Sequence, residues 1–251
     1  MPRNLKVSDH IEMLGDASHR SNMEGPWHET KRHDSDRFTG IVLSTNRWNA
    51  AGTAIPGTND SIAISEVQGG EVLITTGSED DDSCMLSGAV IYSADKRAAV
   101  EWRILITDVS GTAVFAGFSD AKVEDNGKIA IGYPGDALDT EATNAVGFVI
   151  DADHATSSIM CASVKAGTDT TPVDMAVDWA DGEAKTLRVE LDVDGNATFI
   201  LDPGSVSEKR AYIASAITDS TLLCATVQAI TRANDGSNTV RVKAYDAWQD
   251  E

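Results

Sequence analysis

The sequence is poor in cysteine, and the few cysteines present are isolated from one another. Three occur in 251 residues, each alone in an apolar stretch: Cys84, Cys161 and Cys224. Because no CxxC pair is present, neither a cysteine-based zinc cluster nor a disulfide framework is indicated. We therefore predict three buried free thiols and a soluble protein made in a reducing cytoplasm.

Long hydrophobic runs and excess basic charge are also missing. No apolar run approaches the roughly 18 residues of a membrane span, and residues 1–15 contain no continuous apolar segment of the signal-peptide kind. The chain has 20 Lys and Arg against 40 Asp and Glu, a formal charge of -20. Such a charge repels phosphates and anionic lipids, so we expect neither nucleic acid nor a membrane as a partner.

Short alternating segments separated by turn residues dominate the rest of the chain. Only 6% of residues are aromatic and 20 are glycine, which favours short strands joined by tight turns. In residues 100–106 the apolar side chains alternate, and this period places Trp102 in the core. We predict that 100–106 and 112–118 form a hairpin. Further strands are expected at 61–65, 71–76, 89–92, 145–151, 158–164, 222–230 and 239–248.

The best-defined unit is a hairpin over residues 185–202. Leu187, Val189, Leu191 and Val193 alternate with polar residues, which is typical of a strand with one buried and one wet face. Asp194-Gly195-Asn196 then supplies residues that tolerate positive φ, and the apolar alternation resumes after this turn.

Residues 1–37 differ from this pattern. They hold four of the five histidines and show neither a period of 2 nor a sustained period of 3.6, so we expect an extended arm before a sandwich domain over 38–251. Trp27 follows Gly25-Pro26 in a segment that cannot build its own core. It is expected to anchor either on another surface or on its own sandwich. Stretches 79–83, 121–141 and 165–174 are expected to be loops.

Three stretches together resemble a known group of proteins. Residues 181–200 resemble the central hairpin of laminin-G-like, concanavalin A-like sandwiches, and residues 102–120 and 223–251 look like parts of the same group. In this order, over roughly residues 40–249, they are similar to structural proteins of tailed-bacteriophage virions that use this jelly roll.

The resemblance implies an all-β jelly roll of two antiparallel sheets and a structural, non-enzymatic role. It implies a capsid decoration or cement protein on the virion surface, assembled in the host cytoplasm. Its expected partners are the major capsid protein and sister copies in a homo-oligomer, with a trimer favoured. An arm that orders on binding can wrap a large surface. The expected capsid or oligomer contacts are Trp27, His28, Arg32 and Phe38.

Catalytic and cofactor motifs are incomplete in this sequence. Some sandwiches of this group are glycosidases with a Glu-x-Asp-x-x-Glu strand, but after Glu190 and Asp192 the second Glu is replaced by Gly195. His154 has no nucleophile motif beside it, and no phosphate-binding glycine loop is present. We expect no cofactor. The carboxylates at 79–82 are where a structural calcium ion would bind, although such a run is more often a solvated surface.

The alternative function is glycan binding by a lectin-like module of a phage head or tail fibre, with a host-surface glycan as the ligand. Sugar sites usually present an aromatic platform beside polar groups. The loop aromatics that offer one here are Tyr133 and Trp179. The opposing interpretation is that either ring simply plugs the end of the sandwich.

Overall fold

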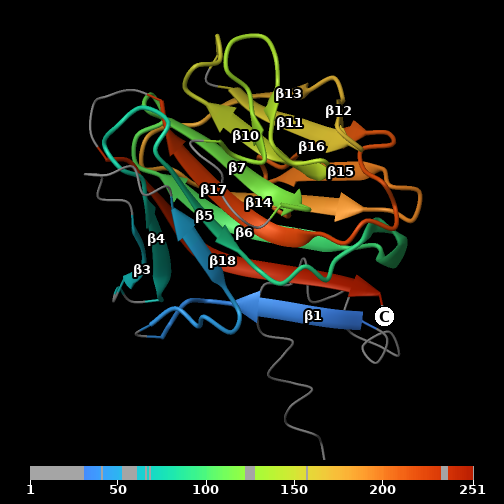
Figure 1. Ribbon diagram of the computed structural model, residues 1–251, viewed down its shortest axis with the longest axis horizontal. Coiled ribbons are helices and arrows are strands. Elements are labelled where there is room, and N and C mark those ends of the chain that lie inside the picture. Colours follow the sequence, from blue (N-terminus) through green and yellow to red (C-terminus); the bar gives the residue numbers. More distant parts are fainter. Residues whose placement is uncertain are drawn as a thin grey trace, which may run out of the picture.

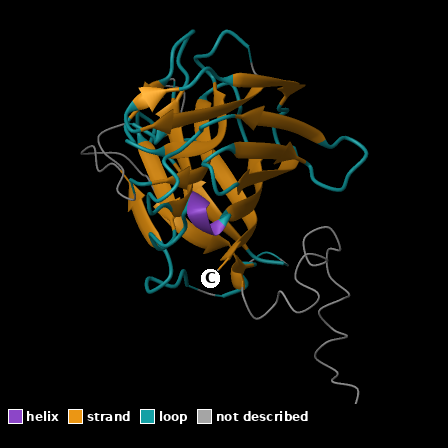
Figure 2. Ribbon diagram, turned by 90° about the vertical axis from the view of Figure 1, so that its right-hand side faces the viewer, coloured by secondary structure: helices purple, strands orange, loops and turns teal. Residues whose placement is uncertain are grey.

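The chain folds into two antiparallel sheets packed face to face (Figures 1 and 2). The computed structural model describes residues 31–40, 42–52, 61–65, 67, 69–121, 128–156, 158–232 and 237–250. One short 3-10 helix, η3 (Ala94–Lys96), lies between strands. None of the described segments is a helix long and apolar enough to cross a bilayer. The predicted all-β jelly-roll sandwich is confirmed.

The first sheet, sheet A, runs in the order β16-β15-β14-β6-β18-β4-β3, and β1 also pairs with β18. Its strands are β1 (Lys31–Asp36), β3 (Ser61–Ser65), β4 (Glu71–Thr75), β6 (Ala99–Ile106), β14 (Ala184–Leu191), β15 (Ala197–Leu201), β16 (Lys209–Ile213) and β18 (Thr239–Asp250).

The second sheet, sheet B, runs in the order β12-β11-β10-β7-β17-β5-β2, and β13 also pairs with β11. Its strands are β2 (Asn49–Gly52), β5 (Ser83–Ser87), β7 (Thr112–Ser119), β10 (Ala145–Asp151), β11 (Ser158–Lys165), β12 (Thr168–Asp169), β13 (Val173–Asp178) and β17 (Cys224–Thr231). A separate two-stranded ladder joins β8 (Ile131–Gly132) to β9 (Asp139–Thr140).

The predicted hairpin at 185–202 is confirmed, because β14 pairs with β15 in antiparallel register. The predicted hairpin between 100–106 and 112–118 is wrong. Both segments are strands, but β6 belongs to sheet A and β7 to sheet B, so the loop between them crosses the sandwich. The physical reason is that β7 is buried along its whole length and needs apolar cover on both faces.

The strand expected at 89–92 is also wrong. The regular strand is β5, which ends at Ser87, and Tyr92 makes only an isolated bridge with Leu223. The chain then turns into η3, which ends the pairing after that one bridge.

An aromatic cluster occupies the core between the sheets. Trp102 is 1% exposed, as its alternation predicted, and its ring centroid lies 4.6 Å from that of Tyr245 and 6.0 Å from that of Trp48. The hydroxyls of Tyr92 and Tyr245 share a buried hydrogen bond of 2.8 Å. Burial raises the pKa of Tyr92 to about 12, so both phenols stay neutral in this core.

All three cysteines are free and buried, as predicted, and they lie on three strands of sheet B: β5, β11 and β17. Burial, helped by the charge of Asp174, raises the pKa of the Cys161 thiol.

The outer face of sheet B is covered rather than exposed. Residues 129–131 and Ala142 pack with Phe115, Val149 and Ile230 in a second apolar cluster. We call residues 129–142 the cover segment. It lies within the stretch predicted to be a loop, and it adds the short ladder β8–β9 there.

The end of the expected arm belongs to the sandwich. β1 pairs with the C-terminal half of β18, from Lys31 opposite Asp250 to Asp36 opposite Tyr245 (Figure 1). Residues 1–30 lie outside the described part of the chain.

Two strands of sheet B approach each other closely at a glycine pair. Gly117 of β7 faces Gly147 of β10, and a Cβ atom on Gly117 would lie 2.2 Å from the carbonyl oxygen of Val146. We predict that Gly117→Ala lowers the free energy of unfolding by about 2–3 kcal/mol, as overpacking does, measured by urea denaturation.

Gly167→Ala is the matched control. A Cβ there meets open space, so only its φ of +74° is unfavourable, at about 1 kcal/mol. Equal losses in the two variants would show that the close approach at Gly117 does not constrain the sheet.

Candidate functional site

Among the hollows on the described part of the sandwich, two have charged residues in their linings. The first, which we call the end pocket, has a volume of about 530 Å³ and lies among loops at one end. Its lining residues are Val109, Ser110, Asp151, Ala152, His154, Trp179, Ala180 and Asp181. They come from the β6–β7 loop, the end of β10 and the β13–β14 loop, three segments that are far apart in the sequence.

His154, which lines the end pocket, stacks on the ring of Tyr133. The rings of Tyr133 and His154 lie 4.1 Å apart between centroids and are inclined by 24°. Nδ1 of His154 is hydrogen-bonded to the carbonyl oxygen of Gly135, and the backbone N–H of Gly135 donates to the carbonyl oxygen of Asp153 at 2.9 Å. These two hydrogen bonds tie the segment that carries Tyr133 to the segment that carries His154.

An internal ion pair lies behind these rings. Arg232 donates to both carboxylate oxygens of Asp151, at 3.1 and 3.0 Å, while the side chains are 9% and 0% exposed. Arg232 also pairs with Asp81 at 3.0 Å. Asp151 accepts a further bond from the backbone N–H of Tyr133 at 2.8 Å, so this carboxylate orients the tyrosine.

The charges that gather around Arg232 shift the pKa values of Asp153 and of Arg232 itself. Burial raises the pKa of Asp153, Arg232 opposes that shift, and the nearby Asp151, Asp80 and Asp81 raise the value further. Burial would lower the pKa of Arg232, but the surrounding carboxylates, Asp151 first among them, outweigh it and raise the value. Arg232 thus stays charged.

The two predicted sugar-facing aromatics have different positions. Tyr133 is half-buried and is not among the lining residues, but its ring stacks on that of His154, which is. Trp179 lines the pocket but is only 3% exposed, and its Nε1 donates to the carbonyl oxygen of Glu183 at 3.0 Å. Its ring packs in the core, so Trp179 closes the floor of the pocket rather than offering a free platform.

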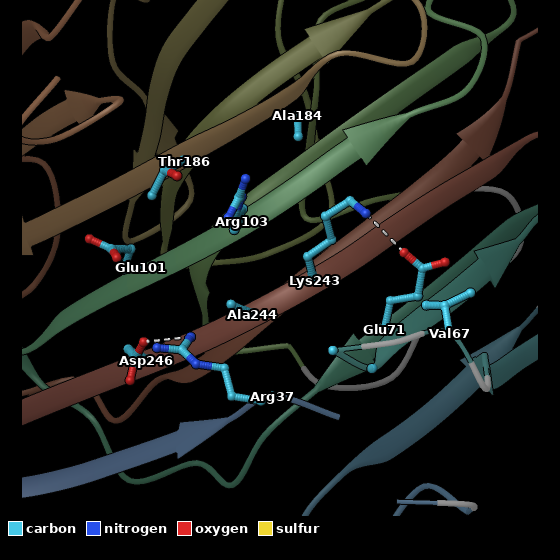
Figure 3. Close-up of a pocket in the computed structure, with 12 residues that line it drawn as sticks. Arg37, Val67, Glu71, Glu101, Arg103, Ala184, Thr186, Lys243, Ala244 and Asp246 are labelled. Atoms are coloured by element: carbon cyan, nitrogen blue, oxygen red, sulfur yellow. Dashed lines mark hydrogen bonds and ion pairs between the residues drawn. The ribbon is translucent and has the colours of Figure 1, made fainter. Parts of the chain in front are cut away.

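The second hollow, which we call the sheet pocket, lies on the outer face of sheet A and has a volume of about 710 Å³ (Figure 3). Its lining residues are Arg37, Val67, Gly69, Gly70, Glu71, Glu101, Arg103, Ala184, Thr186, Lys243, Ala244 and Asp246.

The nearly buried carboxylates of the sheet pocket all have cationic partners. Glu71 is paired with Arg241 at 3.0 Å and Lys243 at 3.1 Å. Asp246 is paired with Arg37 at 3.1 Å and His33 at 3.3 Å.

The third carboxylate, Glu101, accepts a bond from Nε of Arg188 at 2.7 Å, and Arg188 also lies over the ring of Trp248. Together these pairs make the outer face of sheet A polar, whereas the outer face of sheet B is apolar and covered.

The structure describes two of the four predicted capsid or oligomer contact residues. Trp27 and His28 lie outside the described residues. Arg32 is exposed on β1, opposite Gln249. Phe38 is 2% exposed and packs against Trp48, with ring centroids 5.6 Å apart, so its side chain belongs to the core of its own chain.

The acidic positions weighed for catalysis and calcium have local structural roles. Asp192 accepts hydrogen bonds from the backbone N–H groups of Asp194 and Asn196. Partial burial would raise the pKa of Asp192, but these bonds and the Asn196 side chain lower it overall. In the 79–82 run, Asp82 accepts a bond from the backbone N–H of Glu79. Within the described ranges, no group of three or more metal-ligating side chains is placed to hold an ion.

Comparison with known proteins shows the fold but no family. No family model matches the sequence, and no curated protein matches it significantly. A protein of unknown function from Shewanella oneidensis MR-1 has a similar structure, with a TM-score of 0.64 and 11% identity over 100% of this chain and 96% of that one.

Two further similar structures have functional names. One is an immunostimulatory antigen and pseudo β-1,3-glucanase of Mycobacterium tuberculosis, with a TM-score of 0.58 and 11% identity over 87% of this chain and 98% of that one. The other is lectin UEA-II complexed with galactose, with a TM-score of 0.57 and 12% identity over 87% and 98%. The fold is therefore the concanavalin A-like sandwich shared by lectins and glycosyl hydrolase-like proteins.

The sequence pointed to Tyr133 but gave no indication that His154 and Arg232 lie close to it. His154 reads as an ordinary loop histidine, and Arg232 carries no motif. The one signal available was that Asp151 and Arg232 each stand at the end of a strongly apolar run, where a charge needs a partner.

We predict that Arg232→Met destabilises the fold by about 3–5 kcal/mol, because it leaves the carboxylate of Asp151 buried without its cation. Urea denaturation measures this loss. Arg97→Met is the control, since Arg97 is 64% exposed in its pair with Asp250, and loss of an exposed pair costs about 0–1 kcal/mol. A similar small loss at both positions would contradict the role of Arg232.

Proposed function

We propose that this protein is a glycan-binding module and that its end pocket holds the sugar. The observation that carries the proposal is that His154, whose ring is stacked on Tyr133, lines a hollow of about 530 Å³. This volume falls within the range of roughly 300–1,000 Å³ that is usual for small-ligand sites. The comparisons support the class, because solved lectins share the fold.

The chemistry of the pocket suits a neutral sugar. A sugar ring has apolar C–H faces, which pack on aromatic rings, and hydroxyls around its edge, which need polar partners. His154 supplies a ring, and Asp181 supplies a carboxylate of which only one oxygen has a hydrogen bond among the described residues, from the N–H of Val109 at 2.8 Å. Ser110 adds an exposed hydroxyl, which donates to Asp108 at 2.7 Å and leaves its oxygen to accept a bond from a ligand.

Hydrogen bonds within the chain also fix the groups around the end pocket. Asp151 orients Tyr133 through its backbone N–H, and Arg232 fixes Asp151 through two hydrogen bonds. Since these groups are already immobilised, ligand binding needs little additional ordering of the protein.

Binding is a better fit to the residues than hydrolysis. Glycoside hydrolysis uses two carboxyls in defined roles. Here Asp192 is engaged in the turn, and Glu190 lies 3.6 Å from Arg188 across the strand face. Neither is among the residues that line the end pocket.

Attachment to a capsid shell stays a prediction from the sequence. None of the three solved structures named above is described as a virion protein. A glycan-binding module on the outside of a particle is compatible with the expected location, and the test below does not depend on it.

The direct test is a glycan array that includes galactose-terminated and other neutral glycans, followed by calorimetry on the strongest ligand. We expect Tyr133→Ala and His154→Ala to weaken binding roughly tenfold or more, as loss of a central aromatic contact does. Thermal unfolding of each variant checks that the fold is kept.

Tyr212→Ala is the matched control, because Tyr212 is 55% exposed on the edge strand β16, away from the end pocket. Its binding should equal that of the unmodified protein. No binding to any glycan, or equal losses at Tyr133 and Tyr212, would overturn the proposal.

A further inference from the structure

We infer that the sheet pocket is a second binding site, specific for a ligand that carries one carboxylate and several hydroxyls, such as a sugar acid. This site is on the outer face of sheet A, while the end pocket is formed by loops at one end of the sandwich. The inference stands independently of the neutral glycan proposed for the end pocket.

Arg103 is the residue on which the inference depends. It stands on β6 in the middle of the sheet, with Thr186 of β14 on one side and Ala244 of β18 on the other. Both neighbours are small, which leaves open space around the guanidinium group (Figure 3). The side chain of Arg103 is exposed and has neither an ion pair nor a hydrogen bond with any described residue, unlike the other cations lining this hollow.

The other charges of the pocket are already neutralised. Lys243 is paired with Glu71, Arg37 with Asp246, and the remaining carboxylate, Glu101, is held by Arg188. Glu71 is paired with two cations, and Asp246 is paired with Arg37 and contacts His33, so these acids are already engaged by groups other than Arg103. The ligand must therefore supply the anion that Arg103 lacks.

The large negative charge of the whole chain does not prevent an anion from binding at Arg103. The formal charge is -20, but at physiological ionic strength charges are screened beyond about 8 Å. Within the pocket the nearest charges are Arg103, Arg37 and Lys243, together with Arg188 and Arg241 beside it. These five cations exceed the four carboxylates of the same region, which are Glu71, Glu101, Asp246 and Glu190, the last lying 3.6 Å from Arg188, so the local potential favours an anion.

The three carboxylates that line the pocket limit how much negative charge the ligand can carry. A polyanion would place its further charges against Glu71, Glu101 or Asp246, whereas a single carboxylate can lie on Arg103 alone. The planar guanidinium group matches a carboxylate with two parallel hydrogen bonds. The hydroxyl of Thr186, which has no hydrogen bond among the described residues, and the acidic rim suit the hydroxyls of a sugar acid.

The test is an NMR titration of the full chain with D-glucuronate, with D-glucose as the neutral probe and citrate as the polyanion. We expect glucuronate to shift the side-chain Nε–H signal of Arg103, assigned by its absence in Arg103→Gln. Arg103→Gln should weaken glucuronate binding roughly ten- to a hundredfold, which is the range for losing a charged hydrogen-bonding partner. Arg103→Lys should retain part of the affinity.

Arg210→Gln is the matched control, because Arg210 lies on the same face at β16, outside the pocket, and pairs with Glu208. It should bind glucuronate normally. Glucose binding as tightly as glucuronate, citrate binding more tightly, or equal losses in Arg103→Gln and Arg210→Gln would each overturn the inference.

The proposals for the end pocket and for the sheet pocket can be disproved independently of each other. Tyr133→Ala should leave glucuronate binding unchanged, and Arg103→Gln should leave neutral glycan binding unchanged. Loss of glucuronate binding in Tyr133→Ala would contradict an independent sheet pocket.

Discussion

The constraint on which the rest of the structure depends is that the central strands of sheet B are buried on both faces. Every residue of β7, β10 and β17 is buried, so this sheet needs sheet A on one side and another cover on the other. The cover segment, residues 129–142, provides it by packing its own apolar residues on Phe115 and Val149. Burial of apolar area is the main driving force for such an arrangement.

The position of the end pocket follows from that cover. The cover segment carries Tyr133 across the end of sheet B, where its backbone meets Asp151 and its ring meets His154. Arg232, which follows β17, neutralises the acids that gather there. A packing requirement of the sheet thus places an aromatic pair, a buried ion pair and three loops around one hollow.

The sequence predicted where the strands lie better than it predicted which strands pair with one another. Alternation in residues 100–106 and 185–202 depends on one buried face, and both strands and the core position of Trp102 are correct. It could not show that β6 and β7 lie in different sheets, because pairing is decided by contacts with distant strands. Tyr133 could be identified as a loop aromatic from its local sequence. The role of Arg232 could not, because it depends on an ion pair with Asp151, which lies 81 positions away.

The three buried cysteines have a practical consequence for studying this protein. They lie on β5, β11 and β17, three interior strands of sheet B, with β11 toward one edge of the sheet and β5 toward the other. A thiol that is both enclosed and hard to deprotonate reacts with alkylating reagents only when its strand opens. The native sequence therefore contains its own set of probes, and the rate at which each thiol is labelled would map how the sandwich opens, strand by strand.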